Sequence, residues 1–243
     1  MAAPMSAKEV VESNDADIPE KDGEYNDPIH PGIKVRVFVH KNKPDQSSNS
    51  SPVCEPDPDS YSMVSSAGWQ LPANWTYRLN PASVPSSVGS INVTTIVANS
   101  FADWTTAISN KVSVNQGPNT KLTRSSYDSI NLIAWGRTSA SALGVTYIRY
   151  YASTGQVVDV DTIMNTNKKI SWSWSNSTCG DSRSYDAENV MTHEIGHWFG
   201  MDDEYDSTLF ADATMYGYAS KGEVKKKTLT TGDILGAGMI YNP

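Results

Sequence analysis

The fold of this chain is decided by one stretch, HEIGHWFGMDD, at residues 193–203. Its two histidines stand four residues apart, which is about one helical turn, so on a helix both imidazoles project from the same face. We expect that helix over about residues 185–199, with Ser184 or a neighbour as its N-cap and Gly200 as its terminator. The stretch therefore predicts a helix that presents two neutral imidazoles to one metal ion.

The third metal ligand is expected just beyond this helix. Neutral imidazole suits Zn²⁺, and a catalytic zinc site needs three protein ligands plus an open position held by water. The glycine allows a left-handed turn that brings the chain back under the metal, and Asp203 follows three residues later. Asp202 and Glu204 are alternative oxygen ligands, but the spacing favours Asp203. We thus expect one zinc ion held by His193, His197 and Asp203.

Glu194 follows the first histidine ligand, where its carboxylate can reach a metal-bound water without coordinating the metal. Zinc lowers the pKa of such a water to about 7, and Glu194 can take its proton during attack on a peptide carbonyl and return it to the leaving amine. The predicted function is therefore a zinc-dependent endopeptidase. Two alternatives stay open: a catalytically silent binding or adhesion module with structural zinc, which would want a fourth protein ligand, and a zinc amidase with a non-peptide substrate.

Outward from this stretch, the sequence indicates one domain behind a polar extension. Residues 1–60 are rich in Pro, Asp, Ser and Asn, with one alternating strand-like run at residues 33–39, and residues 61–243 form the compact part. Further helices are expected at residues 90–108 and 231–241. Other strand-like runs occupy residues 75–79, 112–114, 130–135, 145–150 and 162–164. This order predicts an α/β fold in which helices pack on a twisted mixed β-sheet.

Two short features precede the last helix. Thr230 and Asp233 have the spacing of a capping box, in which each side chain bonds the backbone amide of the other residue. The run Lys225-Lys226-Lys227 is expected to be a solvated turn, because a short run of like charges usually is. We therefore assign the three lysines no role in binding.

Composition and charge exclude several classes of function. The 243 residues carry a formal net charge of −8 and a sequence pI near 4.9, which argues against a nucleic-acid binder with a basic face. No run of 18 apolar residues occurs, so no transmembrane helix is expected. No signal peptide is visible, yet the few cysteines and the Asn-x-Ser/Thr sequons at Asn49, Asn74, Asn92 and Asn176 favour a secreted protein. We expect a monomer whose partner is a protein or peptide substrate.

The motif His193-Glu194-x-x-His197-x-x-Gly200-x-x-Asp203, followed by Thr214-Met215-Tyr216, resembles that of the metzincin metallopeptidases, and of the matrixins in particular. Other segments also look like landmarks of the matrixin catalytic domain: residues 75–79, the helix with Phe101 and Trp104, and residues 229–234. The resemblance covers about residues 69–243 and does not explain residues 1–50.

This resemblance implies a zincin-like α+β fold. The sheet and two long helices would form an upper subdomain to about residue 200, and residues 201–243 would form a lower one. Met215 would lie in a turn that forms a hydrophobic base beneath the zinc. Calcium is also implied, because matrixins bind it, and Asp159 and Asp161 are candidate ligands of a site that the sequence does not place. We expect residues 144–150 to be an exposed edge strand to which an extended substrate adds.

The sequence departs from the matrixin pattern at two places. The usual third ligand of the matrixins is histidine, whereas Asp203 is similar to a variant in some bacterial metzincins. Where a tyrosine assists the transition state in metzincins, it stands two residues after the methionine. Here Tyr216 and Tyr218 stand one and three residues after Met215, so we assign them no catalytic role.

The two cysteines, Cys54 and Cys179, allow three states. A disulfide between them would close a loop of about 125 residues and would suit an exported protein. Alternatively, residues 52–57 are similar to the matrixin propeptide segment whose cysteine occupies the fourth zinc position, although Val53 and Glu55 replace its arginine and glycine. Two free thiols are the third state. The remaining histidines, His30 and His40, lie in the extension and are assigned no role, because surface imidazoles are commoner there than ligands.

Overall fold

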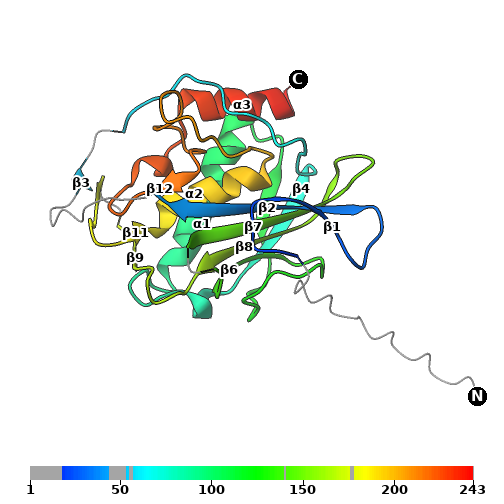
Figure 1. The fold of residues 1–243 in the computed structure, drawn as a ribbon, viewed down its shortest axis with the longest axis horizontal. Coiled ribbons are helices and arrows are strands. Elements are labelled where there is room, and N and C mark those ends of the chain that lie inside the picture. Colours follow the sequence, from blue (N-terminus) through cyan, green and yellow to red (C-terminus); the bar gives the residue numbers. More distant parts are fainter. Residues whose placement is uncertain (1–17, 44–52, 55–56, 140, 176–177, 243) are drawn as a thin grey trace, which may run out of the picture.

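The fold is built on a mixed β-sheet with α-helices packed against it (Figure 1). A computed structural model describes residues 18–43, 53–54, 57–139, 141–175 and 178–242. Within them lie three α-helices and a main sheet of eight strands, which has the order β1-β2-β7-β8-β6-β4-β5 with β12 (Tyr218–Ala219) beside β2. The expected mixed sheet with packed helices is confirmed. Parts of residues 52–57 and the sequons at Asn49 and Asn176 lie outside the described residues.

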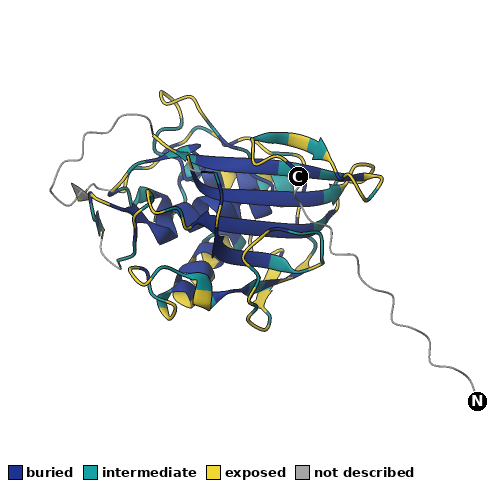
Figure 2. Ribbon diagram, turned by 60° about the horizontal axis from the view of Figure 1, so that its bottom comes forward, coloured by how far each residue is buried: buried dark blue, intermediate teal, exposed yellow. Residues whose placement is uncertain are grey.

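Four neighbouring strands of the sheet run parallel to one another. They are β5 (Ser113–Gln116), β4 (Asn74–Leu79), β6 (Asn131–Gly136) and β8 (Val157–Asn165). β7 (Ala142–Tyr151) continues the sheet antiparallel to β8. Strands β6, β7 and β8 consist mainly of aliphatic and aromatic residues. They are dark blue along most of their length in Figure 2, as expected for strands that are covered on both faces.

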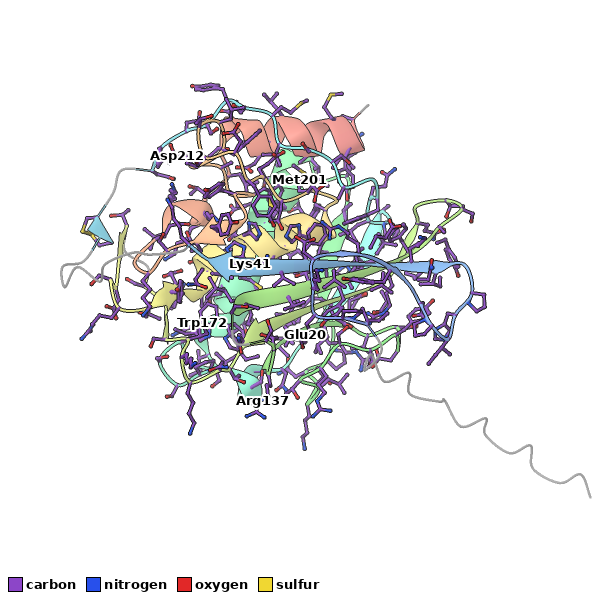
Figure 3. All side chains as sticks on the ribbon, in the orientation of Figure 1. Glu20, Lys41, Arg137, Trp172, Met201 and Asp212 are labelled. Atoms are coloured by element: carbon purple, nitrogen blue, oxygen red, sulfur yellow. A yellow bond between two sulfur atoms is a disulfide. The ribbon has the colours of Figure 1, made fainter. Side chains whose placement is uncertain are left out.

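Three α-helices are present among the described residues. α1 (Asn92–Ala107) buries side chains at helical spacing, namely Val93, Ile96, Val97, Phe101 and Trp104. α2 (Ala187–Trp198) packs against α1 and β7 and is buried along its whole length. α3 (Thr231–Tyr241) packs on α1 and begins with the predicted capping box of Thr230 and Asp233. Side chains fill the space between these helices and the sheet (Figure 3).

Short elements complete the fold around α2. β3 (Val53–Cys54) pairs with β10 (Cys179–Gly180), and β9 (Trp172–Ser173) pairs with β11 (Tyr185–Asp186). The described part of the chain also contains two 3-10 helices, η2 (Pro81–Ser83) and η3 (Lys225–Lys227). Among the described residues, no helix combines the length and the apolarity needed to span a bilayer.

The strand expected at residues 33–39 belongs to the main sheet. It is longer than predicted, as β2 (Ile33–Asn42), and it pairs antiparallel with β7 on one side and with β1 (Gly23–Asn26) on the other. The expectation that residues 144–150 form an exposed edge strand is therefore wrong for this chain. Alternation identifies a half-buried strand, but it does not say which strand will pair with it.

The predicted disulfide between Cys54 and Cys179 is present and joins β3 to β10. Because the sulfur of Cys54 is bonded to Cys179, its thiolate is not available to occupy a metal position. The latency switch at Cys54 and the pair of free thiols are therefore both wrong. The bond connects residues that are 125 positions apart in the chain, so its loop includes most of the sheet and α1.

Removing this disulfide should destabilise the fold. In the chain-entropy model, a loop of this length contributes about 4–5 kcal/mol by restricting the unfolded chain. We expect the Cys54→Ala/Cys179→Ala double variant to lose an amount of that order in its free energy of unfolding, measured by urea denaturation. Wild-type protein denatured in the presence of reductant is the control and should match the double variant. An unchanged denaturation midpoint in both would contradict this role.

Candidate metal centre

α2 supplies three side chains to one buried site. The helix begins at Asp186, whose carboxylate accepts hydrogen bonds from the backbone amides of Glu188 and Asn189, both at 3.0 Å. The N-cap is thus Asp186 and not Ser184. Within the helix, His193 and His197 lie one turn apart and are completely buried, as is Glu194. The helix therefore directs these three side chains into the protein interior, as its sequence predicts.

Backbone carbonyls fix the tautomer of both histidines. The Nδ1 of His193 lies 2.8 Å from the carbonyl oxygen of Thr214, and the Nδ1 of His197 lies 2.9 Å from that of Met201. Because a carbonyl oxygen only accepts, each Nδ1 donates, and each Nε2 is left with a free lone pair. This is the state in which an imidazole binds a metal, with its other ring nitrogen held by a hydrogen bond.

Asp203 reaches the same point from the segment after the helix. Gly200 has φ 88°, and a Cβ on it would lie 2.2 Å from the carbonyl oxygen of Trp69, so only glycine allows this turn. The Oδ1 of Asp203 lies 3.1 Å from the Nε2 of His193 and 3.7 Å from that of His197. Ligand atoms in a tetrahedral zinc site lie about 3.3 Å apart, given bonds of about 2.0–2.1 Å. The three atoms have the spacing of metal ligands.

The two alternative oxygen ligands are directed elsewhere. Asp202 accepts from the backbone amide of Asp203 at 3.0 Å and lies 3.5 Å from the guanidinium of Arg36. Glu204 accepts from the backbone amide of Ser65 at 2.8 Å. Of the three neighbouring carboxylates, Asp203 alone groups with the two histidines.

Several buried polar atoms converge on this point without a hydrogen-bond partner among the described residues. They are the Nε2 atoms of His193 and His197, Oδ1 of Asp203, Oε1 of Glu194 and both ring nitrogens of His40. Leaving a buried polar atom unpaired costs about 1–3 kcal/mol, so such a concentration needs a physical explanation. The free lone pairs of the two Nε2 atoms of His193 and His197 and of the carboxylate oxygens suit a bound cation. The residues present therefore fit a metal ion.

Glu194 is held by β7. Its Oε2 accepts from the hydroxyl of Thr146 at 2.5 Å, and that hydroxyl lies 2.7 Å from the hydroxyl of Thr162. The indole of Trp198 donates to Thr162 at 2.9 Å, which closes a polar chain inside the protein. Burial raises the pKa of Glu194 to about 8, although the hydrogen bond from Thr146 opposes the shift. One carboxylate oxygen is thus anchored, and the other, Oε1, has no hydrogen-bond partner among the described residues.

Met215 packs directly beneath the helix. A Cβ placed on Gly196, between the two histidine ligands, would lie 2.3 Å from the sulfur of Met215. The turn that carries Met215 is fixed by Asp233 at the start of α3, which accepts from the amides of Thr214 at 2.9 Å and Met215 at 3.2 Å. The capping box of α3 therefore also holds the carbonyl that orients His193.

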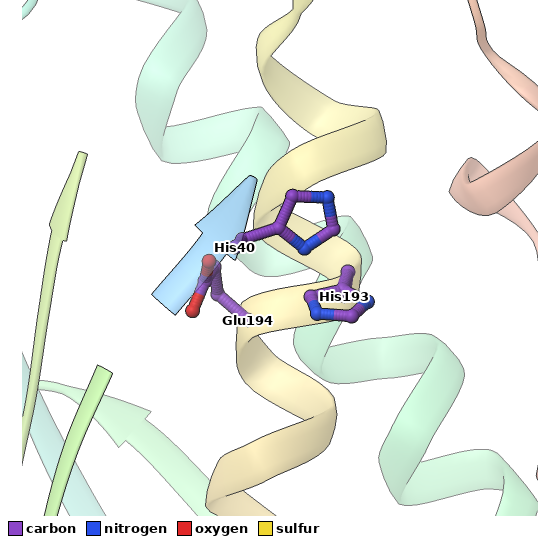
Figure 4. A group of neighbouring side chains, drawn as sticks. All are labelled: His40, His193 and Glu194. Atoms are coloured by element: carbon purple, nitrogen blue, oxygen red, sulfur yellow. The ribbon is translucent and has the colours of Figure 1, made fainter. Parts of the chain in front are cut away.

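Sequence reasoning missed His40, whose ring lies against that of a predicted ligand. It stands on β2, and its ring meets that of His193 edge-on, with centroids 3.9 Å apart (Figure 4). His40, His193 and Glu194 together form a second group of possible metal ligands. The only available signal was the alternation of residues 33–39, which places His40 on the same face as Phe38.

Two further missed residues are Tyr205 and Lys226. The hydroxyl of Tyr205 donates to Oδ2 of Asp203 at 3.0 Å. The expected solvated turn at residues 225–227 is wrong, because Lys226 is completely buried and donates to the carbonyls of Tyr216 and, at 2.9 Å, Tyr218. Burial lowers the pKa of Lys226 to about 8. These tyrosines thus contribute backbone oxygens to a structural lysine.

The two residues suggested as calcium ligands have another partner. The guanidinium of Arg149 lies 2.7 Å from the carboxylate of Asp159 and 3.1 Å from that of Asp161, and all three side chains are buried. Asp161 also accepts from Ser125 at 2.9 Å. Arg149 thus already supplies the cation that these carboxylates need. Calcium stays a prediction without a location.

Comparison with known proteins adds no relative, since no protein-family model and no curated protein matches the chain. The resemblance to matrixins therefore rests on the sequence segments that carry it.

Asp203 provides the sharpest test of the metal centre. We expect Asp203→Ala to weaken zinc binding by more than about 100-fold, because even the loss of an outer-shell partner typically costs 10–100-fold. Affinity is measured by competition with a chromophoric chelator. Asp202→Ala is the matched control and should bind zinc like wild type. Equal affinity of Asp203→Ala and wild type would remove Asp203 from the ligand set.

Proposed function

We propose that the protein is a zinc-dependent endopeptidase in which His193, His197 and Asp203 hold the metal and Glu194 is the general base. The observation that carries this proposal is the convergence of three buried ligand atoms without hydrogen-bond partners, next to an unpaired oxygen of Glu194. The motif resembles that of the matrixins, and the Met215 turn beneath the histidines supports the same family. These features favour peptide hydrolysis over other zinc chemistry.

The chain's own residues account for the proton transfers. Bound zinc supplies a Lewis acid that polarises the substrate carbonyl and lowers the pKa of water. Oε1 of Glu194 is free to accept the proton, because Thr146 holds only Oε2. The same oxygen can then deliver the proton to the leaving amine. Tyr205 and the two backbone carbonyls keep the ligands oriented throughout.

We infer a protein or peptide substrate from the motif and not from a free sheet edge, because both edges of β7 are paired, one with β2 and the other with β8. A strand of the chain itself, β2, is paired antiparallel with β7 and parallel with β12 (Tyr218–Ala219).

The fold and the disulfide agree with this proposal. Strands β5-β4-β6-β8-β7, with α1 and α2, would form the upper subdomain of a zincin-like α+β fold that ends at Gly200. The Met215 turn, β12 and α3 would form the lower one. A disulfide forms in oxidising compartments, which supports secretion.

A catalytically silent module with structural zinc is the second candidate. A closed zinc site requires four protein ligands. The observation in favour of this candidate is His40, a buried imidazole that groups with His193 and Glu194 as a possible metal ligand. Under this alternative, Glu194 would have no chemical task, so its replacement would change nothing measurable at the metal.

Replacing Glu194 distinguishes the two candidates. We expect Glu194→Gln to keep its zinc and to lose at least about 100-fold in kcat/KM on a fluorogenic peptide, because general base catalysis contributes about 10²–10⁴-fold. Glu204→Gln is the matched control. The assay is repeated in a His40→Ala background. This separates inactivity that is caused by the imidazole of His40 from inactivity of a site that does not hydrolyse peptides at all. Equal hydrolysis with and without the Glu194 carboxylate would reject the mechanism.

A further inference from the structure

α2 has a second buried face beside the one that carries the two histidines. His193 and His197 lie one turn apart, and Glu194 and Trp198 repeat that spacing one residue later. Figure 4 shows His193 and Glu194 leaving the helix on different sides. Glu194 accepts a hydrogen bond from a hydroxyl of β7, and the indole of Trp198 donates one to a hydroxyl of β8. This second face of α2 therefore meets the sheet.

The sheet meets this face with two threonines that stand opposite each other. Thr146 of β7 and Thr162 of β8 are partners in the antiparallel register, and both are completely buried. Their hydroxyl oxygens lie 2.7 Å apart, as in other hydrogen-bonded threonine pairs of neighbouring strands. Two positions before Thr146, Gly144 has no side chain, and a Cβ there would lie 2.6 Å from Oε1 of Glu194. β7 thus leaves room for the carboxylate at Gly144 and holds it at Thr146.

The hydrogen bonds of the series Trp198–Thr162–Thr146–Glu194 all have the same direction. An indole N–H only donates and an ionised carboxylate only accepts, whereas each hydroxyl has one proton to give. Thr146 gives its proton to Oε2 of Glu194, so the oxygen of Thr146 must accept from Thr162. The oxygen of Thr162 in turn accepts from Trp198 at 2.9 Å. Hydrogen bonds aligned in this way polarise one another and favour a negative charge at their end.

We propose that three positioning residues hold the carboxylate of Glu194 in the orientation that a general base needs. They are Thr146, Thr162 and Trp198. The aligned donors commit Oε2, and Oε1 is left as the oxygen that accepts a proton, without a hydrogen-bond partner among the described residues. Groups that are fixed in advance lower the barrier because they need no rearrangement during the reaction. The positioning role rests on the proposed peptidase function, whereas the direction of the hydrogen bonds does not.

Nuclear magnetic resonance tests the series without any measurement of activity. The full chain is prepared with isotope-labelled tryptophan and added zinc, and Trp198→Phe identifies the indole signal of Trp198 by its loss. We expect Thr162→Val to move this signal upfield, because the indole proton loses its acceptor. Thr146→Val should move it in the same direction, because Thr162 then loses the acceptor that polarises its hydroxyl. Thr192→Val, which removes a buried hydroxyl that pairs with Ser100 of α1, is the matched control. A signal that Thr146→Val leaves unchanged would refute the continuous series.

Kinetics with zinc bound then test the positioning role. We expect Thr162→Val to lower kcat on a fluorogenic peptide by about tenfold, because the loss of an outer-shell partner typically costs about 10–100-fold. KM should stay near that of wild type, since Thr162 is buried between α2 and the sheet. Thr162→Ser keeps the hydroxyl and should restore kcat. Thr192→Val loses a buried hydrogen bond of the same kind and should keep the kcat of wild type.

The positioning role and the endopeptidase fail in different ways. If wild type hydrolyses the peptide and Thr162→Val has the same kcat, the positioning role is refuted and the endopeptidase stands. An equal loss of kcat in Thr162→Val and Thr192→Val would also refute it, because the series would then contribute only to stability. If wild type with zinc bound hydrolyses no peptide, the endopeptidase is rejected and the positioning role with it, whatever the signal of Trp198 shows.

Discussion

The structure depends on the two hydrogen bonds that the buried histidines donate to backbone carbonyls. Through Nδ1, His193 is tied to Thr214 in the lower part of the fold, and His197 is tied to Met201 at the turn after α2. These bonds set the tautomer that frees both Nε2 lone pairs. They also require α2, the turn at Gly200 and the capping box of α3 to be in place together. The packing of these elements and the orientation of the candidate metal ligands therefore depend on the same two hydrogen bonds.

β7 connects this requirement to the sheet. On one face its Thr146 anchors Glu194, and along the edge opposite β8 it pairs with β2, which brings Phe38 and His40 against His197 and His193. The carboxylate of Glu194 and strand β2 are thus positioned by the same backbone. A small shift of β7 would change both the position of that carboxylate and the pairing of β2.

The sequence predicts local features of this site well and its long-range pairings poorly. Histidines one turn apart, a terminating glycine and the Thr230 capping box follow from helix geometry alone, and all are present. Asp203 followed from spacing beyond Gly200. Lys226 and His40 were missed because neither burial nor contact with α2 is encoded in their neighbours along the chain. The prediction that β7 is an edge strand was wrong for the same reason, because the alternation in β2 does not indicate which strand it pairs with.

The disulfide leaves the N-terminal strands β1 and β2 outside its covalent loop. Because both Cys54 and Cys179 follow β2, a backbone cut between β2 and β3 would leave no covalent bond between the two fragments. Residues 18–43 would then be held only by strand pairing and side-chain packing. Their attachment would become a binding equilibrium, governed by concentration and temperature, and the N-terminal strand would behave as a separable ligand of the fold.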